Sequence, residues 1–194
     1  MSTGAVIGIV IVVLVVLAVV AVLLRMYMQR QRLRAKFGPE YERAVETSDN
    51  RLAAERELTE REKQHAELDL RPLSPAAREN YARHWTLIQE KFVDSPPSAV
   101  TEADRLVTDL MGERGYPTEG FDQQLTVLSV EHANTLEHFR NAHDISQRQD
   151  RGEASTEDLR TAMVHYRTLF EDLLRTSTGE DGPAEPRRDA HRPA

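Results

Sequence analysis

The chain of 194 residues contains no cysteine. Disulfide bonds, thiolate nucleophiles and cysteine-ligated zinc or iron–sulfur sites are therefore excluded. Small extracellular domains often depend on disulfides, so their absence favours a cytoplasmic location for the folded part of the chain.

The sequence also lacks strand patterns and familiar catalytic motifs. No stretch alternates apolar and polar residues as a strand would. Gly112 and Gly115 are not followed by the Lys-Ser or Lys-Thr pair of a phosphate-binding loop, and no Gly-x-Ser-x-Gly elbow occurs. We predict an all-α protein that is not an enzyme. An acid–base pair assembled by the fold is the remaining route to catalysis.

Histidines are present, but their spacing does not predict a metal site. His132, His138 and His143 are six and five residues apart, so they do not share one helix face. Glu62 and His65 match the Glu-x-x-His pattern of di-iron bundles, but those proteins need two such motifs. We therefore predict no metal and no cofactor.

Beyond residue 36 the chain is acidic. The five Arg and Lys residues between positions 25 and 36 leave 20 of the 25 basic residues for the rest, against 32 acidic ones, a net charge of −12. Nucleic-acid binding needs clustered positive charge, so we predict no nucleic-acid partner.

Residues 4–24 form an unbroken apolar run, of which sixteen are Val, Ile or Leu. As a helix, 21 residues extend roughly 31 Å, which matches a hydrocarbon core of about 30 Å. We predict a membrane-spanning helix after a short extracytoplasmic segment, residues 1–3. A cleaved signal peptide is the alternative, but it would have a basic start and a shorter apolar stretch.

A basic segment, residues 25–36, follows the apolar run and contains no acidic residue. It carries Arg25, Arg30, Arg32, Arg34 and Lys36. Positive residues beside a span remain on the cytoplasmic side, so the N-terminus is predicted outside and the rest of the chain inside. The same residues face an anionic leaflet.

Gly4 and Gly8 have the Gly-x-x-x-Gly spacing that lets two membrane helices approach closely. They indicate a possible homodimer contact. The alternative is that they are two small residues at the outer edge of the span with no packing role.

Residues 37–73 read as a charged helical spacer, with one helix from about residue 39 to 70. Pro39 suits a first helical turn, and Arg51 with Glu55 has helical spacing for an ion pair. Tyr41, Val45 and Leu52 share a face. That stripe leaves two alternatives, a short coiled coil or a solvated spacer.

Residues 74–175 are predicted to form a small soluble helical bundle. One helix begins after the cap Ser74, carries Trp85 on its apolar face, and stops at Asp94. Others are expected over 97–111, 121–130 and 132–151. The last begins at a capping box made by Ser155 and Asp158. Residues 176–194 are polar and are expected to be disordered.

Three segments together resemble a known group of proteins. They are the anchor followed by residues 36–45 (KFGPEYERAV), residues 67–74 (ELDLRPLS) and residues 151–159 (RGEASTEDL). The chain resembles an uncharacterised family of actinobacterial single-pass membrane proteins with a C-terminal helical domain, and its arginine-rich composition agrees. The resemblance implies no reaction, cofactor or site residue.

The sequence is thus typical of a membrane-anchored adaptor, scaffold or regulatory protein that binds another protein at the inner membrane face. A small-ligand or sensor domain, with a pocket in the bundle core, is the alternative. The identity of any partner, and the possible homodimer, stay open.

Overall fold

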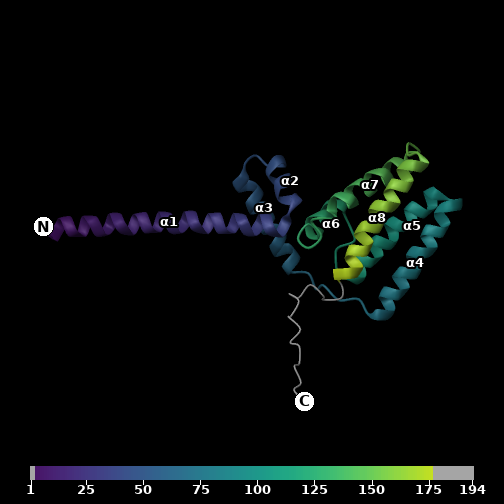
Figure 1. Cartoon of the computed structure of the whole chain (residues 1–194), viewed down its shortest axis with the longest axis horizontal. Coiled ribbons are helices and arrows are strands. Elements are labelled where there is room, and N and C mark those ends of the chain that lie inside the picture. The colour runs from purple at the N-terminus through teal and green to yellow at the C-terminus, as the bar shows by residue number, and fades with distance from the viewer. Residues whose placement is uncertain (1–2, 177–194) are drawn as a thin grey trace, which may run out of the picture. The chain divides into compact units, whose positions relative to one another are not determined.

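The computed structural model describes residues 3–176, and the surroundings of side chains from residue 11 onward. This part of the chain contains eight helices and no strand, so the predicted all-α class is confirmed (Figure 1). The chain divides into two compact units, residues 1–63 and residues 64–194.

Helix α1, Thr3–Phe37, carries the apolar run. The large apolar side chains between residues 11 and 24 are 45–62% exposed. By length and composition α1 is able to cross a membrane. It continues without a break through the basic segment, so one helix joins the apolar run to the rest of the first unit.

The predicted single spacer helix is wrong in one respect, because it is interrupted. The structure has α2, Pro39–Thr47, and α3, Arg51–Ala66, with a bend over residues 48–50. Asn50 caps α3, since its Oδ1 accepts a hydrogen bond from the backbone N–H of Ala53 at 3.0 Å. A Ser-Asp-Asn sequence favours a turn through such side-chain bonds.

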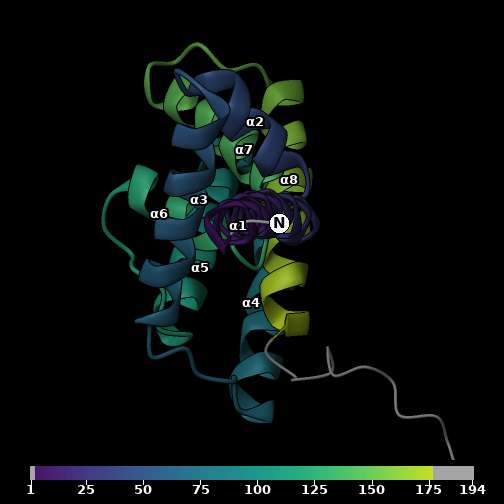
Figure 2. The ribbon, with the colours of Figure 1, turned by 90° about the vertical axis from the view of Figure 1, so that its left-hand side faces the viewer.

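The bend lets α2 and α3 lie side by side next to the C-terminal end of α1 (Figures 1 and 2). Their shared core holds Leu33, Phe37, Tyr41, Ala44, Ala54 and Leu58, all buried. Leu52 is exposed instead. A coiled coil over these residues needs an uninterrupted helix, which the chain does not form between residues 39 and 66.

The second unit is a bundle of four longer helices with one short helix. They are α4 (Pro75–Asp94), α5 (Pro96–Glu113), α6 (Phe121–Leu128), α7 (Leu136–Asp150) and α8 (Thr156–Thr176). Helix α8 packs against α7 and α5, and α5 packs against α4. The two helix starts predicted from capping residues are confirmed. Ser74 Oγ accepts a hydrogen bond from the backbone N–H of Ala77 at the start of α4. At the start of α8, the N–H of Ser155 donates to the Asp158 carboxylate and the N–H of Asp158 donates to Ser155 Oγ.

The predicted helix over 132–151 starts later, at Leu136. Residues 129–135 form tight turns, in which the N–H of His132 bonds to the carbonyl of Leu128 and that of Thr135 to the carbonyl of His132. This turn carries the His132 side chain into the interior, where it is buried. The expected disordered tail lies outside the described residues from position 177 onward.

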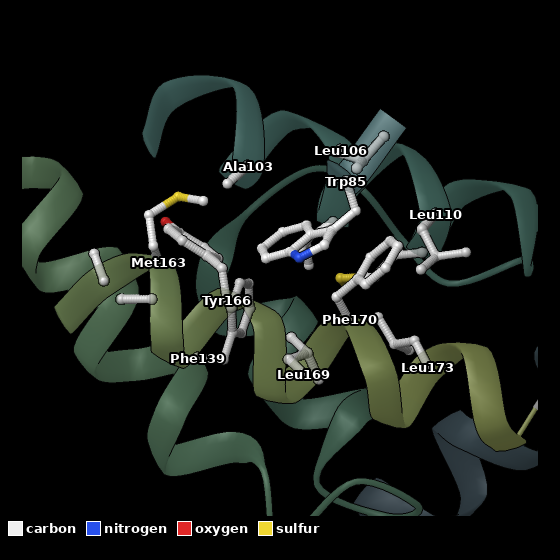
Figure 3. Packing of buried hydrophobic residues seen from close by; sticks show 14 of the residues in the cluster. Trp85, Ala103, Leu106, Leu110, Phe139, Met163, Tyr166, Leu169, Phe170 and Leu173 are labelled. Atoms are coloured by element: carbon white, nitrogen blue, oxygen red, sulfur yellow. The ribbon is translucent and has the colours of Figure 1, made fainter. Parts of the chain in front are cut away.

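The bundle core is built around aromatic residues from α4 and α8. The Trp85 and Phe170 rings stack with centroids 4.8 Å apart and an interplanar angle of 19° (Figure 3). The hydroxyl of Tyr166 reaches Asp104 on α5 at 2.7 Å. Further buried members include Ala103, Leu106, Leu110, Phe139, Leu169 and Leu173. The aromatic face predicted around Trp85 is therefore core.

Candidate functional site

Four of the five basic residues predicted as a topology signal form ion pairs inside the first unit. Arg34 contacts Glu42 on α2 at 2.5 Å. Arg32 and Lys36 both contact Glu62 on α3, at 3.1 and 2.9 Å. Arg30 contacts Glu55 at 3.1 Å. The acidic residues of α2 and α3 thus neutralise much of the basic segment.

Glu55 is the buried centre of these contacts. Its Oε1 accepts hydrogen bonds from the Tyr41 hydroxyl at 2.9 Å and from Arg30 Nε at 3.1 Å. Burial raises the pKa of Tyr41, and the neighbouring Glu55 carboxylate raises it further. The sequence paired Glu55 with Arg51 on the same helix. The structure gives it partners from two other helices instead.

Gly4 and Gly8 lie within α1, at positions whose side-chain surroundings are outside the described residues. The homodimer contact that their spacing indicates therefore stays a prediction.

A second cluster of polar side chains lies in the bundle. Its first member, Tyr116, is positioned by the C-terminal end of α5. Gly115 adopts φ +91°, and its N–H bonds to the carbonyl of Gly112 while the next N–H, of Tyr116, bonds to Met111. This is a Schellman C-cap, which reverses the chain after a helix. It turns Tyr116 inward, where the side chain is buried.

His132 and Asp172 form the centre of this cluster. Nδ1 of His132 lies 2.7 Å from Oδ2 of Asp172, and Thr135 Oγ1 donates to the same oxygen at 3.0 Å. Arg175 contacts the other carboxylate oxygen. Burial raises the pKa of Asp172, but the hydrogen bonds from His132, Thr135 and Arg175 outweigh it, and the pKa falls to about 2.

The network continues through Tyr116. Its hydroxyl lies 3.2 Å from Nε2 of His132 and donates to Oε2 of Glu131 at 3.0 Å. Burial and the charge of Glu131 raise the pKa of Tyr116. Nε2 of His65 lies 3.6 Å from the other oxygen of Glu131. Both ring nitrogens of His132 are engaged, so the network joins separate segments of the bundle instead of offering a base to solvent.

His138, His143 and His165 lie in other contacts and do not converge with His132. Nδ1 of His138 lies 2.8 Å from Nδ1 of His165, and His143 stacks on Phe121 with centroids 3.7 Å apart. Burial and the neighbouring His138 lower the pKa of His165. Within residues 3–176, no group of three or more His, Asp or Glu side chains is arranged to hold a metal ion.

The outer surface beside α4 is the third candidate. Among the large apolar side chains described in the second unit, only Leu87, Val93 and Val164 are exposed, at 59%, 82% and 59%. They come from α4 and α8. We refer to these three residues and the grooves beside them as the α4 surface.

A groove lies on each side of α4. One, of about 180 Å³, lies between α4 and α8, and the other, of about 240 Å³, lies between α4 and α5. The first is lined by Gln89, Phe92, Arg160, Met163, Val164 and Arg167. The second is lined by His84, Leu87, Ile88, Glu102, Arg105, Leu106 and Asp109. Both grooves are lined by apolar and charged side chains, a mixture that is typical of contact surfaces between proteins.

No family model, curated protein or solved structure matches the chain. The resemblance to actinobacterial single-pass membrane proteins therefore stays a prediction based on the three quoted segments.

Proposed function

We propose that this chain is a single-pass membrane protein whose helical bundle binds a protein partner at the cytoplasmic face of the membrane. The exposed apolar side chains of α1 between residues 11 and 24 support the anchor. Exposing apolar side chains to water costs about 25 cal/mol of free energy per Å² of surface. In a bilayer the same side chains contact lipid tails instead of water.

The basic segment supports the orientation. Arg25 follows the apolar run directly, Arg30 lies five residues later, and the first acidic residue of the chain is Glu40. Positive residues beside a span set its direction during insertion. We infer that this step precedes the folding of α2 and α3, so the later ion pairs of the basic segment do not cancel the signal.

The α4 surface is the observation that carries the interaction role. Large apolar side chains are buried or half-buried elsewhere in the described part of the bundle, yet Val164 and Leu87 are exposed and each lines one of the two grooves. Val93, on α4, is exposed as well. Exposed apolar side chains gathered beside concave surfaces mark binding sites on soluble domains. The role requires no catalytic residue and no cofactor.

Site-specific photo-crosslinking in cells tests this proposal. A photoreactive amino acid is placed at Leu87, Val93 or Val164, and at the exposed control positions Asp144 and Glu153. We expect one shared adduct from the three apolar positions and none from the controls. Mass spectrometry identifies the adduct, and the purified partner is then titrated with the full chain in detergent.

A matched substitution completes the experiment. The double variant Leu87→Glu/Val164→Glu should weaken binding of the purified partner at least tenfold, because both charges would enter an apolar contact. Asp144→Lys should leave the affinity within about twofold. Adducts of equal yield at all five positions, or an affinity unchanged in the double variant, would reject the α4 surface as the binding site.

A further inference from the structure

The first unit contains a groove that begins where the apolar run ends. It lies between α1 and α3 and has a volume of about 370 Å³. Arg25, Gln29 and Arg32 line it from α1, and Thr59 and Glu62 line it from α3, with apolar Met28 and Leu33 completing the wall. Small-molecule sites usually have volumes of about 300–1,000 Å³, and this groove falls within that range.

The charges around this groove do not balance. Glu62 is the only carboxylate among its lining residues, and it already contacts both Arg32 and Lys36. Arg25 forms no ion pair with any residue that the structure describes. Two cations, Arg25 and Arg32, thus line the groove with one carboxylate, which Lys36 also contacts from outside the lining, so the groove carries a net positive charge.

Positive charge is concentrated in this groove, because the other basic residues of the segment have their own acidic partners. Arg30 contacts Glu55, and Arg34 contacts Glu42. Neither Arg30 nor Arg34 lines the groove. The anion-attracting part of the basic segment is therefore one face of α1, not the whole segment.

That face lies at the depth of lipid headgroups if α1 spans the membrane. Arg25, Gln29 and Arg32 occupy positions i, i+4 and i+7, which share one side of a helix. Arg25 directly follows the apolar run, and Arg32 is about 10 Å further along the helix axis. A headgroup layer of roughly 5–8 Å on each side of the hydrocarbon core covers this interval from Arg25 past Gln29. The long side chain of Arg32 can extend back towards the same layer.

We propose that this groove binds the phosphate of an anionic phospholipid, through the guanidinium groups of Arg25 and Arg32 and the side-chain amide of Gln29. Guanidinium groups form paired hydrogen bonds with phosphate oxygens. The site rests on the proposed membrane anchor. The site adds a ligand class to that anchor, namely a lipid whose headgroup carries net negative charge.

Native mass spectrometry of the full chain, purified in a neutral detergent, tests the site. Phosphatidylglycerol or phosphatidylcholine is added at equal concentration, and bound lipid is counted. We expect at least a tenfold preference for phosphatidylglycerol, which Arg25→Gln should reduce to less than threefold. Arg34→Gln removes one charge from the same segment outside the groove and should leave the preference within twofold.

Three results would overturn the site. The first is an equal loss of preference in Arg25→Gln and Arg34→Gln, which would indicate diffuse electrostatic attraction. The second is equal retention of both lipids by the unaltered chain. The third is displacement of the lipid by millimolar glycerol 3-phosphate, which would indicate a site for free phosphate compounds instead of a lipid.

The anchor is tested separately on the same variants. Membranes containing each variant are washed with alkaline carbonate and floated on a density gradient. A chain that floats but shows no lipid preference would reject the headgroup site and leave the anchor standing. A chain that washes off would reject the proposed anchor itself. Circular dichroism of Arg25→Gln should match the unaltered chain, because Arg25 is exposed.

Discussion

His132 Nδ1 lies 2.7 Å from Asp172 Oδ2, and both side chains are buried in the bundle. This contact joins the turn before α7 to the last turn of α8, 40 residues later in the chain. Because the bonds from His132, Thr135 and Arg175 hold the Asp172 carboxylate in its charged form, the stability of the bundle depends on pH.

The sign of this dependence follows from the pKa of Asp172. It is about 2 in the folded protein against 3.8 ordinarily, so its contribution is complete above pH 4 and is lost as the pH falls towards 2. The difference corresponds to about 2 kcal/mol. We expect Asp172→Asn to be less stable by about this amount at pH 6, with the gap narrowing below pH 4.

Urea unfolding followed by the fluorescence of Trp85, the one tryptophan of the chain, measures this difference. The full chain is used in neutral detergent between pH 2 and pH 6. A gap between the two proteins that stays constant over this range would show that Asp172 gains nothing from its charge.

Gly115→Ala should destabilise the bundle. Gly115 adopts φ +91°, and a Cβ at this position would lie 2.4 Å from the carbonyl oxygen of Asp69. The left-handed conformation alone costs about 1–2 kcal/mol for alanine, and the backbone clash adds to it. Gly152→Ala is the matched control, because Gly152 has φ +72° but no atom within 4 Å of the added Cβ.

Thermal unfolding monitored by Trp85 fluorescence compares these two variants. We expect the melting temperature to fall clearly further in Gly115→Ala than in Gly152→Ala. Equal falls in melting temperature would mean that Asp69 moves away from the added Cβ without loss of stability. The left-handed backbone conformation alone would then account for both falls.

Trp85→Ala should cost about 3–5 kcal/mol, because the indole stacks on Phe170 inside the core. Trp85→Phe keeps an aromatic ring in this position and should lose clearly less. Urea unfolding followed by circular dichroism at 222 nm gives both values. A loss below about 1 kcal/mol for Trp85→Ala would contradict the buried position.

Glu55→Ala should loosen the first unit. It removes the acceptor of the Tyr41 hydroxyl and of Arg30 Nε, at a cost of about 1–3 kcal/mol. Glu57→Ala, two residues away on α3, removes only an exposed pair with Arg61, worth about 0.3–0.5 kcal/mol.

Hydrogen exchange of the α3 amides separates these two cases. We expect exchange at Leu58 to accelerate tenfold or more in Glu55→Ala, and less than about threefold in Glu57→Ala. Similar acceleration in both variants would show that the buried Glu55 contacts contribute no more than a surface ion pair.

The orientation of the chain is open to direct labelling, since the sequence contains no cysteine. Glu79→Cys places a single thiol at an exposed position of α4. A membrane-impermeant maleimide should label it only after the cells are permeabilised. Labelling of intact cells would place the bundle outside and move the search for partners to the envelope.

Much of the fold follows from local signals in the sequence. Ser74 before Pro75, and Ser155 with Asp158, predict two helix starts because their side chains satisfy free N–H groups within a few residues. The apolar spacing around Trp85 predicts a core face for the same local reason. Such signals need no knowledge of the rest of the chain.

The candidate sites depend on distant residues, and the sequence predicted them less well. Asp172 and Tyr116 were missed, because nothing near either residue indicates that His132 will lie beside it. The sequence offered only His132 itself, at the start of an expected helix, and no motif that pointed to its partners. Residues 132–135 form turns instead of the expected helical turn, and in return His132 and Thr135 make buried polar contacts with Asp172 on α8. Only the packing of α8 against this turn stabilises that arrangement.

The sequence by itself determined the apolar run, the basic segment after it and the amphipathic helices of the bundle, because hydrophobicity and helical periodicity are properties of neighbouring residues. The tertiary structure decided which partners the charges found. Glu62 bound Arg32 and Lys36 only because the chain bends at residues 48–50 and returns to α1. Arg25 is the one basic residue of that segment without an acidic partner among the described residues.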